Sequence, residues 1–188
     1  KMDLLQEAIM TRGTVRPDDV LSVPFLNHSI DTKLLCAMGE EWKRLFADEG
    51  ITKILTVEAS GIALAFATAL AMDLDFVFAK KTSSRNLGKD VYETRVFSYT
   101  RGVEYRMTIA KDALTPADRV LLIDDFLAMG SALEALRKLA VNTGATVVGA
   151  GIAVENTFQP GGERLRAQGL RIESLARIKS INPLAFES

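Results

Sequence analysis

Two patterns of apolar residues alternate along the chain. Apolar residues at helical spacing, or runs rich in Ala and Leu, predict helices over residues 3–12, 32–48, 61–72 and 130–142. Short apolar runs predict strands over residues 20–23, 51–57, 75–79, 119–124, 146–154 and 171–178. Two of these runs, 119–124 and 146–154, are continuous, which is typical of strands buried on both faces. Repeated strand–helix–strand units predict an α/β fold with an open, mainly parallel sheet flanked by helices on both faces.

One polar segment breaks this alternation. Residues 80–90, KKTSSRNLGKD, have no apolar period and predict a mobile loop. The segments after it, YETRVFSYT and EYRMTIA, alternate like two antiparallel strands joined at Arg101–Gly102. Neither a linker nor an internal repeat interrupts the chain, so we expect one domain over residues 1–188. We expect the segments at the two ends of the chain to cover part of this domain.

Composition narrows the classes of function. The 188 residues are nearly half hydrophobic, which suits one ordered globular core. With 23 basic against 24 acidic residues, the charge argues against a chain built mainly to hold a nucleic-acid backbone. One cysteine, Cys36, and one histidine, His28, exclude an intrachain disulfide and a His-based metal cluster. Helical spacing predicts that Cys36 is a buried thiol and that Trp42 packs in the core.

The sequence also favours a cytoplasmic location. The first ten residues, KMDLLQEAIM, are amphipathic and carry acids, unlike a signal peptide. No segment approaches the apolar run needed to span a bilayer. We therefore expect a soluble protein in a reducing, cytoplasmic setting.

The stretch RVLLIDDFLAMGSALEAL carries most of the candidate chemistry. A predicted buried strand ends at two adjacent acids, Asp124 and Asp125, and a short loop follows before Gly130 and Ser131 open a helix. Ligands of open α/β sheets bind outside the carboxyl ends of the strands. A loop entering a helix presents unpaired N–H groups and the positive end of the helix dipole, which suit a phosphate. Two carboxylates beside it can accept hydrogen bonds from vicinal hydroxyls, so the stretch predicts a site for ribose 5-phosphate. An acidic surface corner is the alternative interpretation.

This stretch resembles the signature of type I phosphoribosyltransferases that binds phosphoribosyl pyrophosphate (PRPP). FLNHSID (25–31), VFAKKTSS (77–84), VENTFQPGG (154–162) and ESLARIKSI (173–181) further resemble, in that order, the bacterial xanthine phosphoribosyltransferase family of purine salvage. The resemblance runs over nearly the whole chain. It implies a type I phosphoribosyltransferase-like fold, in which about residues 1–30 and 155–188 contribute a small hood.

The resemblance implies roles for individual residues. Asp124 and Asp125 match the catalytic acids that contact the ribose. The PRPP-binding positions match Ala128, Met129, Gly130, Ser131 and Ala132 in one loop, Ala59, Ser60 and Gly61 in TVEASGIALA, and the lysines Lys80 and Lys81. The base-contacting positions match Leu21, Asn27 and Asn156. No direct protein ligand to a metal is implied, because Mg²⁺ is expected to bind through PRPP and water near the two acids.

Three positions depart from the family pattern. Met129 stands where Thr or Asn is usual and Ala132 where Thr is common, which leaves phosphate binding to backbone N–H groups and Ser131. Asn156 stands where the family has a lysine that contacts the base. An asparagine offers a neutral amide instead of a charge. Since xanthine ionises more readily than most purines, this departure makes hypoxanthine or guanine a credible substrate.

The implied activity is transfer of the 5-phosphoribosyl group from PRPP to a 6-oxopurine, with xanthine as the expected base, giving XMP and diphosphate. Hypoxanthine or guanine is the alternative base, and an adenine or pyrimidine enzyme is a further alternative. A PRPP-sensing DNA-binding regulator is disfavoured, because the strand pattern begins near residue 20 and leaves no room for a winged helix. No general base is evident; Glu155 is only adjacent in sequence to Asn156.

The resemblance also predicts two features of assembly and closure. The basic loop that contains Arg85 and Lys89 is expected to close over the diphosphate and exclude water. A homodimer is expected, since single-domain enzymes of this family often pair near their active sites. The expected partners are small-molecule substrates, without a nucleic acid or a membrane.

Overall fold

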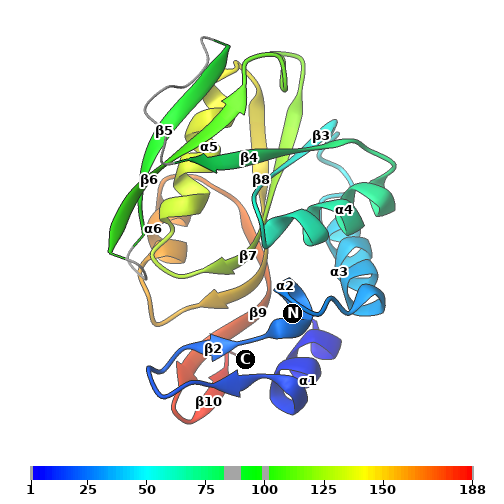
Figure 1. Cartoon of the computed structure of the whole chain (residues 1–188). Helices are drawn as coiled ribbons and strands as arrows, with labels where there is room; N and C mark the ends of the chain where they lie inside the picture. Colours follow the sequence, from blue (N-terminus) through cyan, green and yellow to red (C-terminus); the bar gives the residue numbers. More distant parts are fainter. Residues whose placement is uncertain (1, 83–89, 99–101, 188) are drawn as a thin grey trace.

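The structure, a computed structural model, describes residues 2–82, 90–98 and 102–187. A central sheet of eight strands runs in the order β10-β9-β8-β7-β3-β4-β6-β5, with helices on both faces (Figure 1). The five strands from β9 to β4 are parallel, whereas β10, β6 and β5 are antiparallel to their neighbours. The prediction of an open, mainly parallel sheet flanked by helices is therefore confirmed.

The predicted helices and strands are present in the predicted order, and β1, α2, α6 and β10 are additional to them. The strands of the central sheet are β3 Lys53–Val57, β4 Phe76–Thr82, β5 Val91–Ser98, β6 Val103–Ala110, β7 Arg119–Leu127, β8 Thr146–Asn156, β9 Ile172–Ile181 and β10 Leu184–Phe186. A separate two-stranded sheet consists of β1 Thr14–Val15 and β2 Leu21–Ser22. The helices are α1 Asp3–Arg12, α2 Pro24–Asn27, α3 Thr32–Leu45, α4 Gly61–Met72, α5 Ser131–Asn142 and α6 Gly161–Ala167.

The continuous apolar strands are buried on both faces, as predicted. In β7, Leu121 belongs to the hydrophobic cluster that contains α3 and α4, whereas Leu122 belongs to the cluster that contains α5. Ile54 and Leu55 of β3 divide between the same two clusters. Successive side chains of a strand point to opposite faces, so an unbroken apolar run supplies both cores at once.

Helix α3 confirms one expectation and corrects another. Asp31 caps it, because its carboxylate accepts a hydrogen bond from the N–H of Leu34 at 3.0 Å. Trp42 is fully buried, as predicted, and its ring nitrogen donates to the carbonyl of Glu173 at 3.3 Å. The prediction of a buried Cys36 is wrong, because its side chain is exposed. Position 36 lies about 200° around the helix from positions 34 and 38, which face the core.

The N- and C-terminal segments lie together at one end of the molecule (Figure 1). The N–H of Met2 donates to the carbonyl of Leu175 at 2.9 Å, and the amide of Asn182 donates to Asp19 at 3.0 Å. These contacts join α1 and the β1–β2 sheet to β9 and the segment before β10. The domain boundaries, residues 1–188 with a hood from both ends, stay a prediction.

Two strands continue past their predicted ends. β7 does not stop at the acids but pairs with β8 as far as Leu127, opposite Glu155, because β8 is itself long enough to pair there. β4 extends through Thr82, so Lys80 and Lys81 lie in a strand paired with β6 and not at the start of a loop. Residues 83–89 of the predicted mobile loop, with Arg85 and Lys89, lie outside the described residues, as does Arg101 of the predicted connection at Arg101–Gly102.

Across the described segments, no helix is both long and apolar enough to cross a membrane.

Candidate active site

Asp124 and Asp125 lie inside β7, near its carboxyl end. Their exposed fractions are only 5% and 9%. The Asp124 carboxylate accepts a hydrogen bond from the N–H of Asp125 at 2.9 Å, and the Asp125 carboxylate accepts one from the N–H of Phe126 at 3.0 Å. Backbone donors therefore fix one oxygen of each acid, and the second oxygen of Asp125 accepts from the Asn27 amide at 3.3 Å. The remaining lone pairs of both carboxylates can accept hydrogen bonds from a ligand.

Burial dominates the electrostatics of this pair. Loss of solvent raises the pKa of Asp124 well above its ordinary value, and the adjacent charge of Asp125 raises it further. The nearby cation of Lys81 acts in the opposite direction and lowers the pKa of Asp124. Two buried acids side by side are costly in the free protein, so the site favours a ligand that brings hydroxyl donors or cations.

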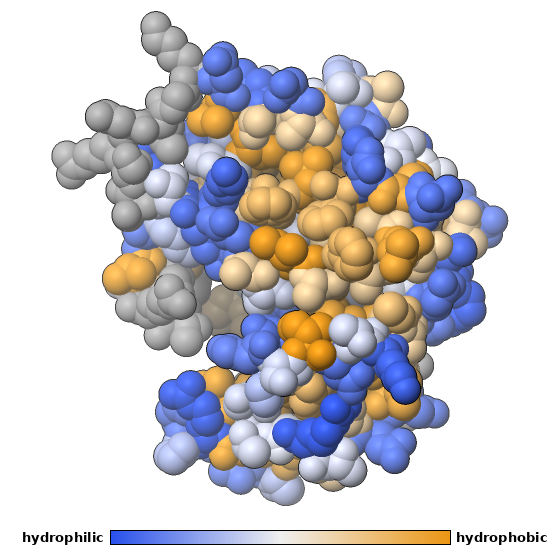
Figure 2. Space-filling view, turned by 45° about the vertical axis from the view of Figure 1, so that its right-hand side comes forward, coloured by the Kyte–Doolittle hydropathy of each residue, from blue (hydrophilic) through white to orange (hydrophobic). Residues whose placement is uncertain are grey.

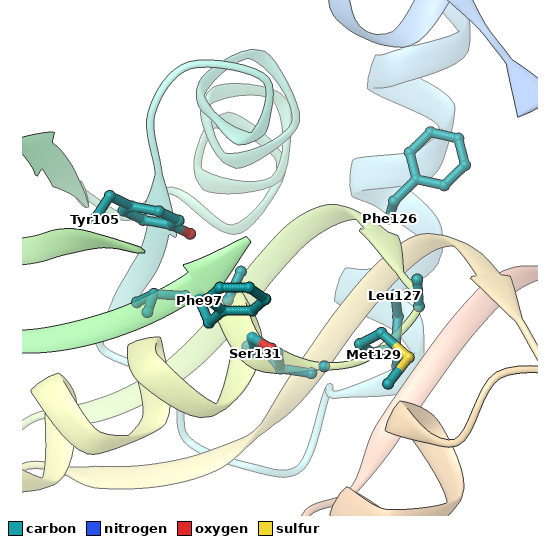
Figure 3. Close-up of a pocket in the computed structure, with 11 residues that line it drawn as sticks. Phe97, Tyr105, Phe126, Leu127, Met129 and Ser131 are labelled. Carbon is teal, nitrogen blue, oxygen red and sulfur yellow. The ribbon is translucent and has the colours of Figure 1, made fainter. Parts of the chain in front are cut away.

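Residues 128–132, which run from the end of β7 into the first residues of α5, are the candidate anion loop and follow the two acids in the chain. Gly130 precedes α5 with φ +83°, a left-handed conformation that glycine adopts at little cost. The loop and the start of α5 line a cavity of about 210 Å³, which Phe97 and Tyr105 of the β5–β6 hairpin border from the other side (Figure 3). Helix α5 begins at Ser131, so the first-turn N–H groups lie at this cavity. All five predicted residues of this loop line it.

The second predicted loop, Ala59–Gly61, lies at the start of α4 and close to Asp124. A side chain at Gly61 would overlap the Thr56 hydroxyl and lie 3.6 Å from an oxygen of Asp124. Glycine is therefore required for this close approach of α4 to β3. The Thr56 hydroxyl is buried and has no hydrogen-bond partner among the described residues. The two candidate anion loops thus follow the carboxyl ends of β3 and β7, which are neighbouring parallel strands, and Asp124 lies near the end of β7.

The two lysines have different environments. The N–H of Lys81 donates to the Glu58 carboxylate at 2.6 Å, and its ammonium group lies 5.4 Å from the ring centre of Tyr105. Lys81 thereby connects Glu58, which directly follows β3 and precedes the Ala59–Gly61 loop, to the β5–β6 hairpin that borders the cavity at residues 128–132. Lys80 is exposed, and within residues 2–82, 90–98 and 102–187 its side chain makes no hydrogen bond or ion pair with the acids.

The three predicted base-contacting residues are only partly brought together. The Asn27 amide donates to Asp125 at 3.3 Å, and its oxygen lies 2.7 Å from a ring nitrogen of His28. Asn156 ends β8, where its amide nitrogen donates to Gln159 at 3.1 Å. The Asn156 oxygen is buried without a partner in the described structure, so it is a free acceptor. Leu21 is instead packed in the hydrophobic core, with 6% exposure.

Glu155 is a buried structural acid and not an exposed strand-end acid. Arg166 donates to both its oxygens, at 2.5 and 2.7 Å, and the Ser174 hydroxyl donates at 2.5 Å. Burial alone raises the pKa of Glu155, but the hydrogen bonds from Arg166 and Ser174 outweigh it, so the net pKa is lowered. A carboxylate held in this way is a poor acceptor for a purine proton.

The sequence interpretation missed α6, which contacts the anion loop. The N–H of Gly161 donates to the carbonyl of Ala128 at 3.0 Å, and Arg164 donates to the carbonyl of Met129 at 3.2 Å and to Glu134 at 3.1 Å. The only sequence signal is the paired glycine of GGERLRA, followed by two arginines. That signal does not reveal which loop they contact.

The donor set fits a magnesium ion only in part. In the described part of the chain, no group of three or more His, Cys, Asp or Glu side chains is placed to hold a metal. Asp124 and Asp125 offer carboxylate oxygens, the ligand type that Mg²⁺ prefers, and the raised pKa of Asp124 marks a place where a cation is favourable. The geometry agrees with a metal that brings most of its ligands with the substrate and water.

Comparison with known proteins agrees with this geometry. No protein-family model matches the chain. It is 50% identical to the xanthine phosphoribosyltransferase of Shouchella clausii (strain KSM-K16) over 182 residues, 96% of this chain and 90% of that protein. It is also 50% identical to the xanthine phosphoribosyltransferase of Finegoldia magna (strain ATCC 29328) over 179 residues, 95% of this chain and 94% of that protein.

Solved structures support the fold. The adenine phosphoribosyltransferase of Giardia lamblia, complexed with 9-deazaadenine, has a TM-score of 0.79 at 24% identity and covers 92% of this chain and 97% of its own. The adenine phosphoribosyltransferase of Thermoanaerobacter pseudethanolicus has a TM-score of 0.77 at 24% identity, and the match covers 92% of this chain and 99% of that protein. At such low identity these structures establish the shared fold alone. The sequence relatives go further, and from their identity and coverage the chain belongs to the xanthine phosphoribosyltransferase family.

Proposed function

We propose that the chain transfers the 5-phosphoribosyl group of PRPP to a 6-oxopurine, with xanthine as the expected base, and releases XMP and diphosphate. One observation carries the proposal: the buried acids Asp124 and Asp125 and the anion loop 128–132 belong to one continuous β7–α5 unit. Acids of this kind suit the ribose hydroxyls, and the loop suits the terminal phosphate. The second loop at Ala59–Gly61 suits the diphosphate.

The reaction breaks the C1–O bond of PRPP and forms a bond from C1 to a purine nitrogen. Positive charge develops on the ribose ring while negative charge develops on the leaving diphosphate. Asp124 and Asp125 orient the ribose by accepting hydrogen bonds from its hydroxyls, and their charge favours the developing cation. The two backbone loops fix the anionic ends of the substrate, so positioning and electrostatics supply most of the rate.

We include Mg²⁺ in the proposal as a metal that arrives with PRPP. Asp124 and Asp125 would hold it through water, and when bound it neutralises charge on the leaving diphosphate. Lys81 adds a fixed positive charge on the same side, since it already acts on the pKa of Asp124. Lys80 is proposed to contact PRPP only on the family resemblance.

Base choice is assigned to Asn27 and Asn156. Asn27 keeps one amide hydrogen and one oxygen lone pair after its bonds to Asp125 and His28, so it can both donate to and accept from a purine. The unpaired oxygen of Asn156 is a buried acceptor that a ring N–H or an exocyclic amino group would satisfy. The amino group is a feature of guanine, so this observation supports a guanine enzyme as the alternative, whereas a ring N–H is common to xanthine, hypoxanthine and guanine. Leu21 is proposed to contact the base through its backbone.

The apolar side of the molecule supports a homodimer. Helix α4 is apolar all round, yet Phe66 and Leu70 are 58% and 66% exposed, and Figure 2 shows a broad apolar area on this side. A helix with this composition is usually buried. The cavity of about 500 Å³ next to it is lined by Phe66 and also by Ala59 and Ser60 of the second anion loop. A second copy of the chain packed here would lie beside the Ala59–Gly61 loop, which also fits the family expectation.

Light scattering on a sizing column tests the dimer. The double variant Phe66→Glu with Leu70→Glu is expected to elute as a monomer, whereas the unmodified chain elutes as a dimer. Val141→Glu is the matched control, because Val141 is an equally apolar, 56% exposed residue on α5, across the sheet. A monomeric unmodified chain would contradict the assignment.

The cytoplasmic location is likewise proposed, since an exposed free thiol at Cys36 suits a reducing compartment.

A substrate panel tests the activity. Turnover of xanthine, hypoxanthine, guanine, adenine and orotate is measured with PRPP and magnesium. We expect a 6-oxopurine to be the preferred base. Preference for adenine or orotate would overturn the substrate class, and absence of turnover together with salt-dependent DNA binding would favour a PRPP-sensing regulator instead.

A further inference from the structure

Helix α6 holds two consecutive carbonyl groups of the anion loop. The backbone N–H of Gly161 donates to the carbonyl of Ala128 at 3.0 Å. The Arg164 guanidinium donates to the next carbonyl, that of Met129, at 3.2 Å. Both oxygens are therefore directed toward α6.

A peptide unit is planar and trans, so its carbonyl and its N–H point in opposite directions. The Ala128 carbonyl shares its peptide unit with the N–H of Met129, and the Met129 carbonyl shares its unit with the N–H of Gly130. Fixing these oxygens toward α6 directs the two N–H groups away from α6. Residues 128–130 line the cavity beside α5, and none of the residues that line this cavity belongs to α6, so the loop separates the cavity from α6. A flipped peptide would present a carbonyl oxygen to a phosphate and repel it.

The packing between α6 and the loop is close enough to enforce this orientation. A side chain on Gly161 would overlap the Ala128 oxygen and would come within 2.6 Å of the nitrogen of Gly130. A side chain on Gly130 would lie 3.0 Å from Leu165. The loop therefore rests directly on the backbone of α6, with no space for an alternative path.

Arg164 also joins the loop to α5. Its second donor bonds Glu134, in the first turn of α5, at 3.1 Å. Helix α6 is itself anchored to β8 by the two hydrogen bonds between Arg166 and the buried Glu155. Helix α6 thus holds the anion loop directly, and it is itself bonded to α5 through Arg164 and to β8 through Arg166.

We propose that Arg164 is a positioning residue for the terminal-phosphate subsite, which orients the Met129–Gly130 peptide so that its N–H faces the phosphate. This inference rests on the proposed function, since it assumes that the loop binds the 5-phosphate of PRPP. Met129 and Ala132 add no side-chain donor to this subsite, so the backbone N–H groups and the Ser131 hydroxyl must supply the contacts.

The inference predicts a selective loss of affinity. Arg164→Met keeps the apolar stem and removes both hydrogen bonds. We expect the KM for PRPP and the Kd for ribose 5-phosphate to rise about tenfold, with the Kd for inorganic diphosphate and the KM for the base changed less than about twofold. Arg164→Lys keeps one donor and is expected to recover part of the loss. Calorimetry and steady-state kinetics in the presence of magnesium measure all four quantities.

Arg137→Met is the matched control. Arg137 lies on α5 and donates to the carbonyl of Gln168, directly after α6, at 3.3 Å, so it makes the same kind of bond without contacting the loop. Its substitution should leave the affinity for ribose 5-phosphate unchanged. Equal losses of affinity for ribose 5-phosphate and for diphosphate in Arg164→Met, or no loss for either ligand, would refute the positioning role. Neither result would contradict the proposed function. A wild-type chain that binds neither PRPP nor ribose 5-phosphate would refute the proposed function, and the inference with it.

Discussion

Asn27 donates a hydrogen bond to Asp125 across 3.3 Å, although the two residues are 98 positions apart in the chain. The bond connects α2, from the N-terminal segment, to the carboxyl end of β7. It makes the residue assigned to the base an immediate neighbour of an acid assigned to the ribose. A nucleobase bound at Asn27 would therefore lie next to C1 of a ribose held by Asp125, which is the geometry that glycosyl transfer requires.

Removal of both acid charges tests the ribose contacts. The double variant Asp124→Asn with Asp125→Asn is expected to lose at least about a hundredfold in kcat/KM for PRPP, because two charge-assisted hydrogen bonds are lost. The asparagines keep the size of the side chains, so the fold should persist. Steady-state kinetics and a thermal melt check both points. Near-normal turnover would show that the acids do not hold the ribose.

Asp124→Asn alone is expected to stabilise the free protein. Burial and Asp125 raise the pKa of Asp124, so the folded chain holds a proton that the unfolded chain releases. Stability from this group is present below its ordinary value of 3.8 and is lost as pH rises through the raised folded pKa. The melting temperature of Asp124→Asn should therefore exceed that of wild type by a margin that grows from pH 4 toward pH 8. An equal or shrinking margin would contradict the assigned pKa direction.

The sequence predicts the elements of this fold better than their ends. Helix α4 is found at its predicted bounds, because Gly61 and an unbroken Ala- and Leu-rich run mark it without ambiguity. The end of β7 was misplaced, because two adjacent acids resemble a strand terminus. In the structure they are buried within the strand, where β8 pairs beyond them. Charged residues usually lie at the surface, so a sequence pattern does not predict that acids at a binding site are buried inside a strand.

The remaining features that the sequence did not predict depend on contacts between segments far apart in the chain. Helix α6 was missed because GGERLRA is short and carries two glycines, which are poor helix formers. Its bonds to Ala128 and Met129 exist only because β8 and β7 are neighbours in the sheet. Leu21 shows the converse, since a residue assigned by resemblance proves to have its side chain in the core.

Asn156→Lys tests the control of base choice. A lysine would replace a neutral amide with a charge that favours an anionic base, and xanthine ionises more readily than hypoxanthine. We expect the ratio of kcat/KM for xanthine to that for hypoxanthine to rise about tenfold in this variant. Gln159→Ala serves as the control, since it removes the present partner of Asn156 without adding charge. An unchanged ratio in Asn156→Lys would mean that position 156 does not contact the base.

Glu155→Gln is expected to destabilise the fold by about 3 kcal/mol, because it leaves Arg166 without its buried charge partner. Glu155 is 2% exposed, and its hydrogen bonds from Arg166 and Ser174 lower its pKa despite burial. A lowered folded pKa gives stability that is present above the ordinary value of 4.5 and is lost as pH falls. The difference in unfolding free energy between wild type and variant, measured with denaturant, should therefore shrink below about pH 4, opposite to the trend for Asp124→Asn.

Glu173→Gln is the matched control. The Glu173 carboxylate pairs with Arg171 at 2.9 Å but is 32% exposed, so its loss should cost no more than about 1 kcal/mol of stability. Equal losses in the two variants would show that the Glu155 ion pair does not anchor α6.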